Sequence, residues 1–291
     1  MSKIYDGIMG LVVGDALGVP FEFKKRDTFK ATGMTGWGTY YLPPGTWSDD
    51  SSLTLATVES LGRLGRIDLD DIMRNFFLWQ IHGAFTPYGE VFDVGNTTRT
   101  AIRKFASGVP AHQCGGNKIM DNGNGSLMRI LPLAFIEHSL LDVFDVSSLT
   151  HAHRISMQAC LCYVDIATFL LKGLKKEDAI TPLHNYPAEF NRIETIATLS
   201  RDEIKSSGYV IDTLEAALWC FLTTSNYRDC ILEAVNLGED TDTVAAVAGG
   251  LAGIYYGIGG ENGIPQEWID SIPKKEEIKL WCDKLAEGAI L

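Results

Sequence analysis

Apolar residues recur at intervals of three and four positions along most of the 291-residue chain. This spacing is typical of helices with one buried face. It predicts helices over residues 6–18, 50–64, 68–82, 97–107, 126–138, 152–174, 189–205, 212–224, 227–236, 242–257 and 274–288. Alternation with a period of two is nearly absent, and only TGWGTYYL, residues 35–42, is compatible with a short hairpin. The pattern therefore predicts an all-α fold of roughly ten to thirteen helices.

The residues at the expected helix ends agree with this reading. Side chains suited to N-capping stand at Asp68, Asn96, Ser126 and Asp240, and helix-ending glycines at Gly108, Gly173 and Gly238. The irregular stretches are 24–49, 83–96, 108–125 and 181–188, and the first three are long enough to suggest functional loops. Because no repeat, low-complexity tract or linker divides the chain, we expect one compact domain over residues 1–291.

One apolar stretch raises the alternative of a membrane span. Residues 244–260 carry no charge, and Gly249, Gly253 and Gly257 have the small-residue spacing of packed membrane helices. The stretch stands alone without a basic flank, so we interpret it as a buried helix packed closely on a neighbour. The N-terminal segment has no basic region, and Asp6 and Asp15 interrupt it. We therefore expect neither a signal peptide nor membrane association.

Composition limits the partners. A formal net charge of −12 argues against a nucleic-acid surface and against binding to an anionic membrane. An anionic ligand would need help from cations or from backbone N–H groups. The six cysteines form no CxxC pair and no regular ladder, which predicts reduced thiols in the core of a cytoplasmic protein.

Two acidic clusters are the strongest candidates for chemistry. They open two predicted helices, Ser48, Asp49 and Asp50 in GTWSDDSSL and Asp240, Asp242 and Thr243 in GEDTDTVAAV. Either cluster alone is compatible with ordinary helix capping. Together they supply the oxygen ligands that Mg²⁺ and Mn²⁺ take, and a divalent ion would offset carboxylate repulsion of several kcal/mol at ~4 Å. If they face each other, they suit two metals ~3.5–4 Å apart.

A glycine-rich loop precedes the next predicted helix. In DNGNGSLMRILPLA, residues 121–134, two Asn-Gly pairs mark tight turns before Ser126. Such a loop can present backbone N–H groups to a phosphate, although a simple capped turn explains it equally well. It is neither a P-loop nor a dinucleotide fingerprint, because the chain has no βαβ pattern.

Other candidates are isolated. His151 and His153 stand in THAHRIS, where a structural or substrate-contacting role fits better than zinc because no further ligands complete a site. Asp15, Glu22 and Asp93 are single acids among apolar or glycine neighbours, and buried acids of this kind can have shifted pKa values suited to acid–base work.

Six motifs, taken in order, resemble a known family. They are GLVVGDALGVPFEF, GTWSDDSSL, FDVGNTTRTAI, NGSLMRILPLA, THAHRIS and GEDTDTVAAVAGGLAG, and they cover residues 5–257. The combination resembles the ADP-ribosylglycohydrolases of the dinitrogenase reductase-activating type. The resemblance implies an orthogonal all-α bundle around a central cleft with two Mg²⁺ or Mn²⁺ ions. It also implies hydrolysis at the anomeric carbon of ADP-ribose, with ADP-ribosylarginine in a protein as the expected substrate because FDVGNTTR looks closer to the arginine-specific branch.

The resemblance also assigns roles to residues. It implies Ser48, Asp49, Asp50, Asp240, Asp242 and Thr243 as metal ligands, Asp93 and Glu22 as catalytic acids, and Asn122, Gly123, Gly125, Ser126, Arg129, His151 and His153 as the ADP-ribose site. Two positions depart from the family pattern, where threonine is usual at Ser48 and glycine at Glu239. The serine keeps the hydroxyl ligand, and Glu239 adds an acid near the ions.

Alternative functions remain open at this point. They are a non-catalytic ADP-ribose-binding or structural relative, hydrolysis of another acceptor linkage such as serine or O-acetyl-ADP-ribose, and a two-metal phosphohydrolase. The motif layout needs no second chain, so we expect a monomer whose partners are an ADP-ribosylated protein and ADP-ribose.

Overall fold

The computed structural model describes residues 2–180 and 186–288. This part of the chain contains twelve α-helices: α1 (Lys3–Gly18), α2 (Asp49–Leu64), α3 (Leu69–His82), α4 (Asn96–Ala106), α5 (Leu140–Ser148), α6 (Arg154–Leu171), α7 (Lys176–Ala179), α8 (Val210–Thr223), α9 (Tyr227–Asn236), α10 (Thr241–Tyr256), α11 (Gln266–Asp270) and α12 (Lys275–Gly288). Short 3-10 helices connect several of them. No strand occurs within the described ranges, where only isolated bridges are found. The prediction of an all-α fold is confirmed.

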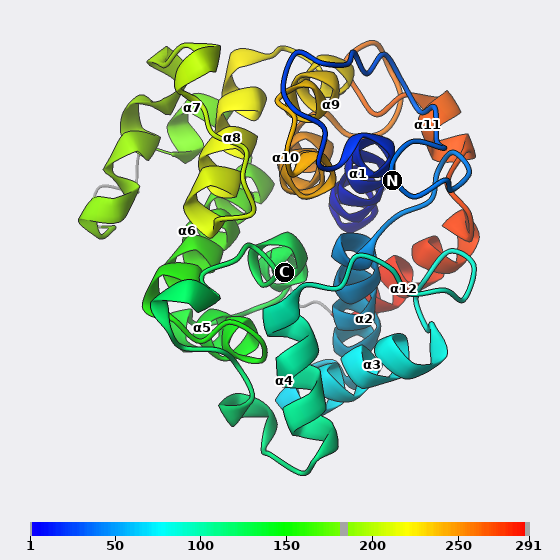
Figure 1. Cartoon of the computed structure of the whole chain (residues 1–291), viewed down its shortest axis with the longest axis vertical. Coiled ribbons are helices and arrows are strands. Elements are labelled where there is room, and N and C mark those ends of the chain that lie inside the picture. The colour runs from blue at the N-terminus through cyan, green and yellow to red at the C-terminus, as the bar shows by residue number, and fades with distance from the viewer. Residues whose placement is uncertain (1, 181–185, 289–291) are drawn as a thin grey trace.

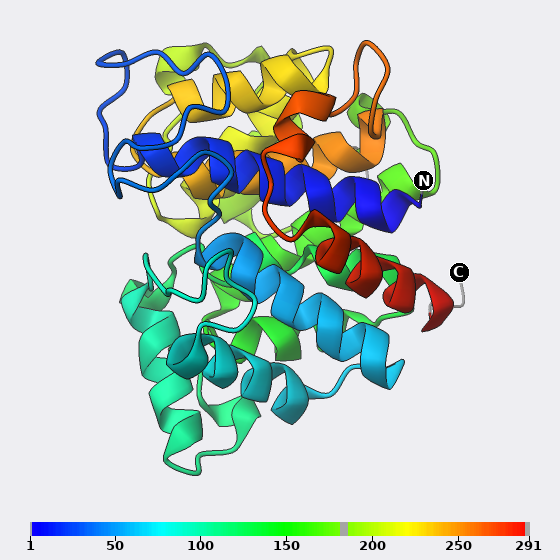
Figure 2. The same cartoon turned by 90° about the vertical axis from the view of Figure 1, so that its right-hand side faces the viewer.

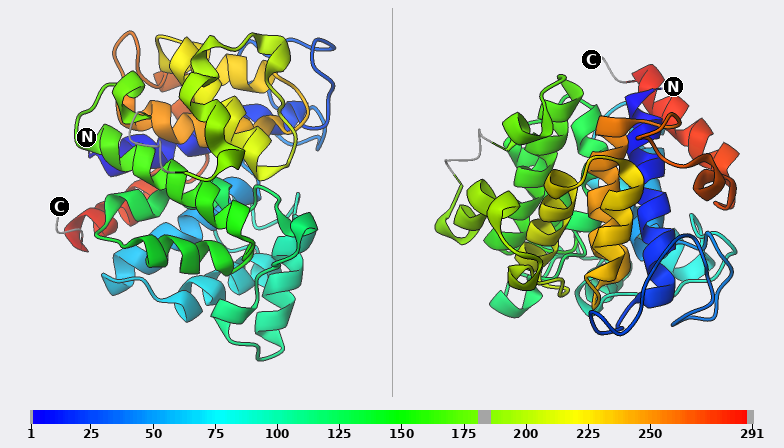
Figure 3. Two further views of the ribbon diagram at one scale, coloured as in Figure 1. Left: turned by 90° about the vertical axis from the view of Figure 1, so that its left-hand side faces the viewer. Right: turned by 90° about the horizontal axis from the view of Figure 1, so that it is seen from above.

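The centre of the fold is the pair α1 and α10, which lie side by side (Figures 1 and 3). Their contact is almost free of side chains: a Cβ atom added at Gly10 would lie 2.3 Å from the Gly249 carbonyl oxygen, and one at Gly14 would lie 2.1 Å from that of Ala245. Only glycine therefore permits this approach. The small-residue spacing in residues 244–260 serves helix packing inside the core, as expected.

The other helices cover this pair in two groups. Helices α2, α3 and α4 lie together below α1 in the view of Figure 2, with α12 between α1 and α2, and α8 and α9 lie above with α10. Helix α6 packs on both α8 and α10. The first turn of α2 meets the C-terminal end of α1, since Asp15 of α1 hydrogen-bonds to residues that open α2. That junction is where the functional candidates gather.

Buried helices explain the apolar runs. Two segments, Lys3–Phe21 and Arg154–Leu171, are long and apolar enough to cross a membrane by length and composition, and 100% and 61% of their windows are buried inside the protein. Burial of this extent is what core helices show. All six cysteines are buried and free, as the sequence predicted.

Three predicted features differ from the structure. Residues 126–138 form two 3-10 segments, Leu127–Arg129 and Leu131–Phe135, because Pro132 lacks the N–H that a continuous α-helix needs. Residues 189–205 are also 3-10, Ala188–Thr198 and Arg201–Glu203. The hairpin at residues 35–42 is absent, and that stretch is a turn without strands.

Helices α5, α7 and α11 were not predicted. Leu140 and Leu141 of α5 are 48% and 67% exposed, so they blur its apolar face, and α7 and α11 are too short to show a period. Of the irregular segment 181–188, residues 181–185 lie outside the described ranges.

The helix ends follow local rules in part. Asp68 accepts a hydrogen bond from the Asp71 N–H, as an N-cap does, and Gly108, Gly173 and Gly238 have positive φ. Asn96 is the first residue of α4 rather than its cap, and neither Ser126 nor Asp240 makes a side-chain capping bond. The side chain of Asp240 is therefore available for another role.

Candidate metal centre and adjoining cavity

The two acidic helix starts lie against each other. The Oδ2 atom of Asp50 accepts hydrogen bonds from the Ser48 hydroxyl at 3.2 Å and from the Thr243 hydroxyl at 3.3 Å. Asp50 and Thr243 are 193 positions apart in the sequence. The close packing of α1 on α10 brings this about, because a Cβ at Gly18 would lie 2.4 Å from the Asp242 Cα. The expected proximity of the two clusters is therefore present in the structure.

Asp15 anchors the start of α2. Its carboxylate accepts the Ser48 N–H at 2.9 Å, the Ser51 N–H at 3.0 Å and the Ser51 hydroxyl at 2.5 Å. It therefore satisfies N–H groups that the first turn of a helix leaves without partners. The sequence marked Asp15 as an isolated acid, and its link to the acidic cluster of Ser48, Asp49 and Asp50 emerges only from the fold.

Five carboxylates from distant parts of the sequence converge here. Oxygen atoms of Asp15, Asp50 and Asp242 lie within 4.8 Å of one another, and so do those of Glu22, Asp93 and Asp242. Asp242 belongs to both groups. The Oδ1 atom of Asp50 and the Oδ2 atom of Asp242 are buried and have no hydrogen-bond partner among the residues that the structure describes. Buried carboxylate oxygens without partners are strongly unfavourable unless a cation or a proton binds to them.

The acid–base properties follow from this crowding. Burial raises the pKa of Asp49, Asp50 and Asp242 well above the ordinary aspartate value, and the neighbouring carboxylates raise it further. Burial and the charge of Asp93 raise the pKa of Glu22 to about 8. Without a cation, the cluster would therefore hold protons near neutral pH. Hard oxygen donors of this kind fit Mg²⁺ or Mn²⁺.

Glu22 and Asp93 form the outer part of the acidic centre. The Tyr40 hydroxyl donates to the Glu22 Oε2 atom at 2.6 Å, and the Tyr40 ring packs on Phe92 with ring centroids 4.9 Å apart. Asp93 has a positive φ of 54°, which costs backbone energy for a residue other than glycine. Burial raises the pKa of Asp93 as well. Sequence reasoning missed Tyr40, whose only signal was its place in a long irregular loop.

A cavity of about 250 Å³ opens above these carboxylates. Its lining includes Glu22, Asp49, Asp93, Asp240 and Thr243 on one side, and Gly123, Asn124, Gly125 and His151 on another. The Asn124 side chain donates to the Asp240 Oδ2 atom at 2.8 Å, so the glycine-rich loop is tied directly to the start of α10. Asn124 belongs to the loop 122–126 that the resemblance assigns to the ADP-ribose site, but its bond to Asp240 was not predicted.

Some predicted substrate-site residues lie behind the cavity wall. Arg129, Ser126 and Asn122 are buried and do not line it. The Ser126 hydroxyl accepts from Ser147 at 3.0 Å, and the Asn122 Oδ1 atom accepts from Ser156 at 2.9 Å. Through these hydrogen bonds, Ser126 and Asn122 anchor the glycine-rich loop to α5 and α6.

His153 likewise does not line the cavity, because its Nδ1 atom accepts the Ile155 N–H at the start of α6. The two histidines of THAHRIS therefore separate, and only His151 faces the cavity. Glu239 is exposed and also absent from the lining.

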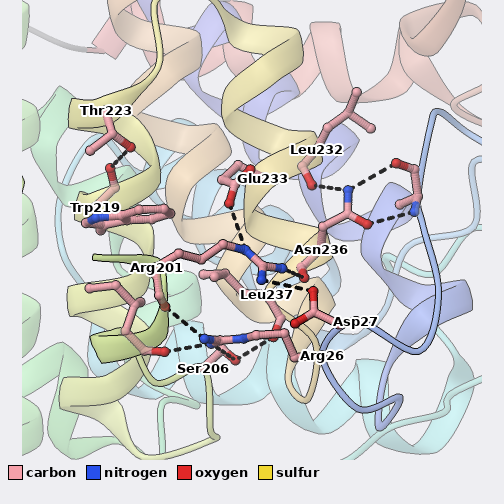
Figure 4. Close-up of polar contacts among 12 residues, drawn as sticks. Arg26, Asp27, Arg201, Ser206, Trp219, Thr223, Leu232, Glu233, Asn236 and Leu237 are labelled. Atoms are coloured by element: carbon pink, nitrogen blue, oxygen red, sulfur yellow. Dashed lines mark hydrogen bonds and ion pairs between the residues drawn. The ribbon is translucent and has the colours of Figure 1, made fainter. Parts of the chain in front are cut away.

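A polar network fixes the turn that carries Asp240. The Arg26 guanidinium donates to the carbonyl oxygens of Leu237 at 2.8 Å, Arg201 at 2.9 Å and Ile204 at 2.6 Å (Figure 4). Arg201 in turn donates to the Asn236 carbonyl oxygen at 2.7 Å and pairs with Glu233. The network joins three chain segments at the C-terminal end of α9, just before the acidic start of α10.

The fold and the site together define an all-α protein with a buried acidic centre that opens into a polar cavity. Comparison with known proteins identifies its family. The family model described as ADP-ribosylglycohydrolase matches residues 1–290. The chain belongs to the ADP-ribosylglycohydrolase family and is a hydrolase.

Two curated relatives and one solved structure illustrate the similarity. The ADP-ribosylarginine hydrolase Tri1 of Serratia proteamaculans (strain 568) is 35% identical over 294 residues, which cover 98% of this chain and 79% of that protein. The ADP-ribosyl-dinitrogen reductase glycohydrolase of Rhodospirillum rubrum is 34% identical, with 95% and 92% covered. A solved structure described as an ADP-ribosylglycohydrolase-related protein complex has a TM-score of 0.85 and 32% identity, and the alignment covers 99% of this chain and 98% of that one.

Proposed function

We propose that this chain removes ADP-ribose from ADP-ribosylarginine in a protein, with two Mg²⁺ or Mn²⁺ ions as cofactors. The observation that carries the proposal is the meeting of the two acidic helix starts beside a polar cavity, with two buried carboxylate oxygens left without partners. The reaction is the hydrolysis of an N-glycosidic bond: the oxygen of water bonds to the anomeric carbon and loses a proton, the C–N bond breaks, and the departing guanidine nitrogen takes up a proton.

The cofactor is supported by the donor set. Ser48, Asp49 and Asp50 with Asp240, Asp242 and Thr243 are the residues that would hold the ions, and Asp15 lies close enough to contribute to the same centre. When bound, divalent cations would supply positive charge that orients the ribose oxygens and favours an activated water. They would also let an acidic protein accept a pyrophosphate.

The chain's own acids supply the proton chemistry. Glu22 and Asp93 lie at the cavity close to Asp242; burial and the charge of Asp93 raise the pKa of Glu22, and burial raises the pKa of Asp93. We assign this pair to the transfer of a proton from water and to the stabilisation of positive charge at the anomeric carbon. Tyr40 holds the Glu22 carboxylate in place through its hydroxyl.

Arginine as the acceptor is supported by two relatives. Both the Serratia proteamaculans protein and one from Pseudomonas putida (strain GB-1), also 35% identical, are named ADP-ribosylarginine hydrolases. The chemistry agrees, because a guanidinium would leave across a cavity edge rich in carboxylates. We further assign the protein to the cytoplasm, where its six buried free thiols would stay reduced, and we expect it to act as a monomer.

The direct test is to incubate the protein with an arginine-ADP-ribosylated protein and either metal, and to follow the release of intact ADP-ribose. We expect release that stops with a chelator and returns when Mg²⁺ or Mn²⁺ is added back. Persistent label on arginine at high enzyme concentration would overturn the proposal.

Parallel reactions with serine-linked ADP-ribose and O-acetyl-ADP-ribose test the other acceptors, and AMP or phosphate as the product would indicate a phosphohydrolase. Tight binding of ADP-ribose without hydrolysis of any substrate would indicate a binding protein.

A further inference from the structure

Arg129 is a buried cation without a carboxylate partner among the described residues. Its side chain has no exposed surface, and its Nε and Nη1 atoms have no hydrogen-bond partner. Its Nη2 atom donates to the Val146 carbonyl oxygen at 3.2 Å and to the Thr150 hydroxyl at 2.7 Å, and its guanidinium lies 4.7 Å from the centre of the Phe76 ring. Burying a charge in this way costs free energy. The contacts of Arg129 indicate a role beyond packing.

The Thr150 hydroxyl links Arg129 to the cavity. It is completely buried, and within the described chain its hydrogen-bond contacts are Arg129 and the Nδ1 atom of His151, at 2.8 Å. Arginine can only donate hydrogen bonds, so the Thr150 oxygen accepts from it. The hydroxyl hydrogen then has a single acceptor available, the Nδ1 atom of His151. If His151 donated instead, the buried hydroxyl hydrogen would have no partner, which is unfavourable.

This arrangement fixes where His151 carries its proton. Burial and the nearby charge of Arg129 lower the pKa of His151 to about 3, so the imidazole is neutral. A neutral imidazole that accepts at Nδ1 is protonated at Nε2. The Nε2 edge lies against the glycine-rich loop, since Cβ atoms built at Gly123 and Gly125 would be 3.6 Å and 3.3 Å from it, and all three residues line the cavity.

We propose that Arg129 and Thr150 are positioning residues that hold His151 as the Nε2–H tautomer, so that the cavity presents an N–H donor to an oxygen atom of its ligand. The tautomer follows from the protein alone. The identity of the ligand, ADP-ribose, rests on the proposed function. The proposal gives the arginine of NGSLMRILPLA a role although it does not reach the cavity.

The first test is the tautomer itself, measured by ¹⁵N–¹H NMR of the ring nitrogens in the intact labelled protein. The chain has six histidines, so the His151 signals are assigned as those that disappear in His151→Gln. We expect a neutral ring protonated at Nε2 near pH 7. A ring protonated at Nδ1, or an imidazolium, would overturn the proposal whatever the behaviour of any variant.

The second test separates the hydroxyl from general packing. Thr150→Val has nearly the same shape but no hydrogen to donate, and we expect it to give mixed tautomers, whereas Thr150→Ser should behave as the parent. Arg129→Met should also give mixed tautomers, because the Thr150 oxygen, no longer accepting from Arg129, could then accept from an Nδ1–H of His151. Thr57→Val, which removes an equally buried hydroxyl bonded to the Leu53 carbonyl oxygen, is the matched control. A pure Nε2–H signal in Thr150→Val would contradict the assigned role of Thr150.

The third test uses ADP-ribose as the probe in calorimetry. With the two tautomers about equally populated, only about half of the Thr150→Val molecules present the Nε2–H donor, so ADP-ribose should bind about twofold more weakly, with unchanged affinity for Thr150→Ser and Thr57→Val. Unchanged affinity in a Thr150→Val protein with mixed tautomers would overturn the donor role toward the ligand. If the tautomer results are as expected but the parent neither binds nor releases ADP-ribose, the proposed function fails while the positioning of His151 stands.

Discussion

The two oxygens of the Asp242 carboxylate have different surroundings. Oδ1 accepts the Thr243 N–H at 3.0 Å, whereas Oδ2 is buried without a partner. Asp242→Asn removes the charge and keeps the shape. We expect activity to fall at least ~100-fold. Asp242 is the residue common to the two carboxylate clusters, the one with Asp15 and Asp50 and the one with Glu22 and Asp93, so the substitution removes a proposed metal ligand from both. In the presence of chelator, however, the variant should melt at a higher temperature than the parent, because one buried like charge has gone.

These opposite effects distinguish a metal ligand from a structural carboxylate. Activity is measured as ADP-ribose release and stability as the melting temperature with chelator. Asp145→Asn, at an exposed position of α5, is the control and should change neither quantity appreciably. An Asp242→Asn variant as active as the parent would remove Asp242 from the proposed metal site.

Glu239 allows a second test at the residue scale. Its φ is +62°, its N–H donates to the Lys24 carbonyl oxygen at 2.8 Å, and its own carbonyl oxygen accepts from Phe23 at 2.7 Å. Glycine fits this left-handed position without strain but is more flexible when unfolded. We therefore expect Glu239→Gly to be more stable than the parent by up to about 1 kcal/mol, measured by denaturant unfolding.

Glu239→Gln is the matched control, because it removes the charge and keeps the strained Cβ. It should leave the free energy of unfolding within about 0.5 kcal/mol of the parent. Since the side chain is exposed and does not line the cavity, metal preference should be the same in both variants and in the parent. A shift in metal preference shared by the two variants would mean that this charge does act on the ions.

At the scale of the elements, the contact between α1 and α10 determines where the proposed metal ligands lie. A methyl group at Gly14 would lie 2.1 Å from the Ala245 carbonyl oxygen, a backbone atom that cannot rotate away. We expect Gly14→Ala to destabilise the protein by about 3 kcal/mol or more and to weaken metal binding, because the two helices must move apart. The measurements are denaturant unfolding and Mn²⁺ titration.

Gly33→Ala is the control for this change. Its added methyl would lie 3.7 Å from the Trp268 Nε1 atom, an ordinary contact, so stability and Mn²⁺ affinity should stay close to those of the parent. If Gly14→Ala were equally well tolerated, the close approach of α1 and α10 would not be what holds the two acidic helix starts together.

Most of the fold could be predicted from the sequence, because long helices with one buried face leave a clear period. Where that period is broken, the prediction failed: Pro132 turned a predicted helix into 3-10 segments, and exposed Leu140 and Leu141 hid α5. Short acidic motifs at helix starts made the metal-ligand clusters visible. Tyr40 and the bond of Asn124 to Asp240 were missed because these contacts are made across the fold. Arg129 was expected at the cavity because sequence does not show which way a side chain points.

At the scale of the whole molecule, the acidic centre opposes folding unless it is neutralised. Asp15, Asp49, Asp50 and Asp242 are all buried, in a protein whose net charge is already −12. Burial raises the pKa of all four in the folded state, and repulsion from neighbouring carboxylates raises those of Asp49, Asp50 and Asp242 further. The folded metal-free protein therefore binds more protons than the unfolded chain above the ordinary carboxylate pKa, so its stability falls as the pH rises.

Bound metal should remove this dependence of stability on pH, because the metal-bound folded protein and the unfolded chain both carry deprotonated carboxylates above the ordinary carboxylate pKa. For Glu22 the pKa rises from 4.5 to about 8, so metal-free protein should lose stability progressively between these pH values. With Mn²⁺ or Mg²⁺ in excess, binding requires deprotonated carboxylates and stabilises only the folded state, by about 2.7 kcal/mol at one hundred times Kd. Melting temperatures measured with chelator and with metal should therefore diverge as the pH rises from 5 to 8. If the two curves of melting temperature against pH ran parallel, something other than a cation would be neutralising these carboxylates. The two-metal proposal would then fail.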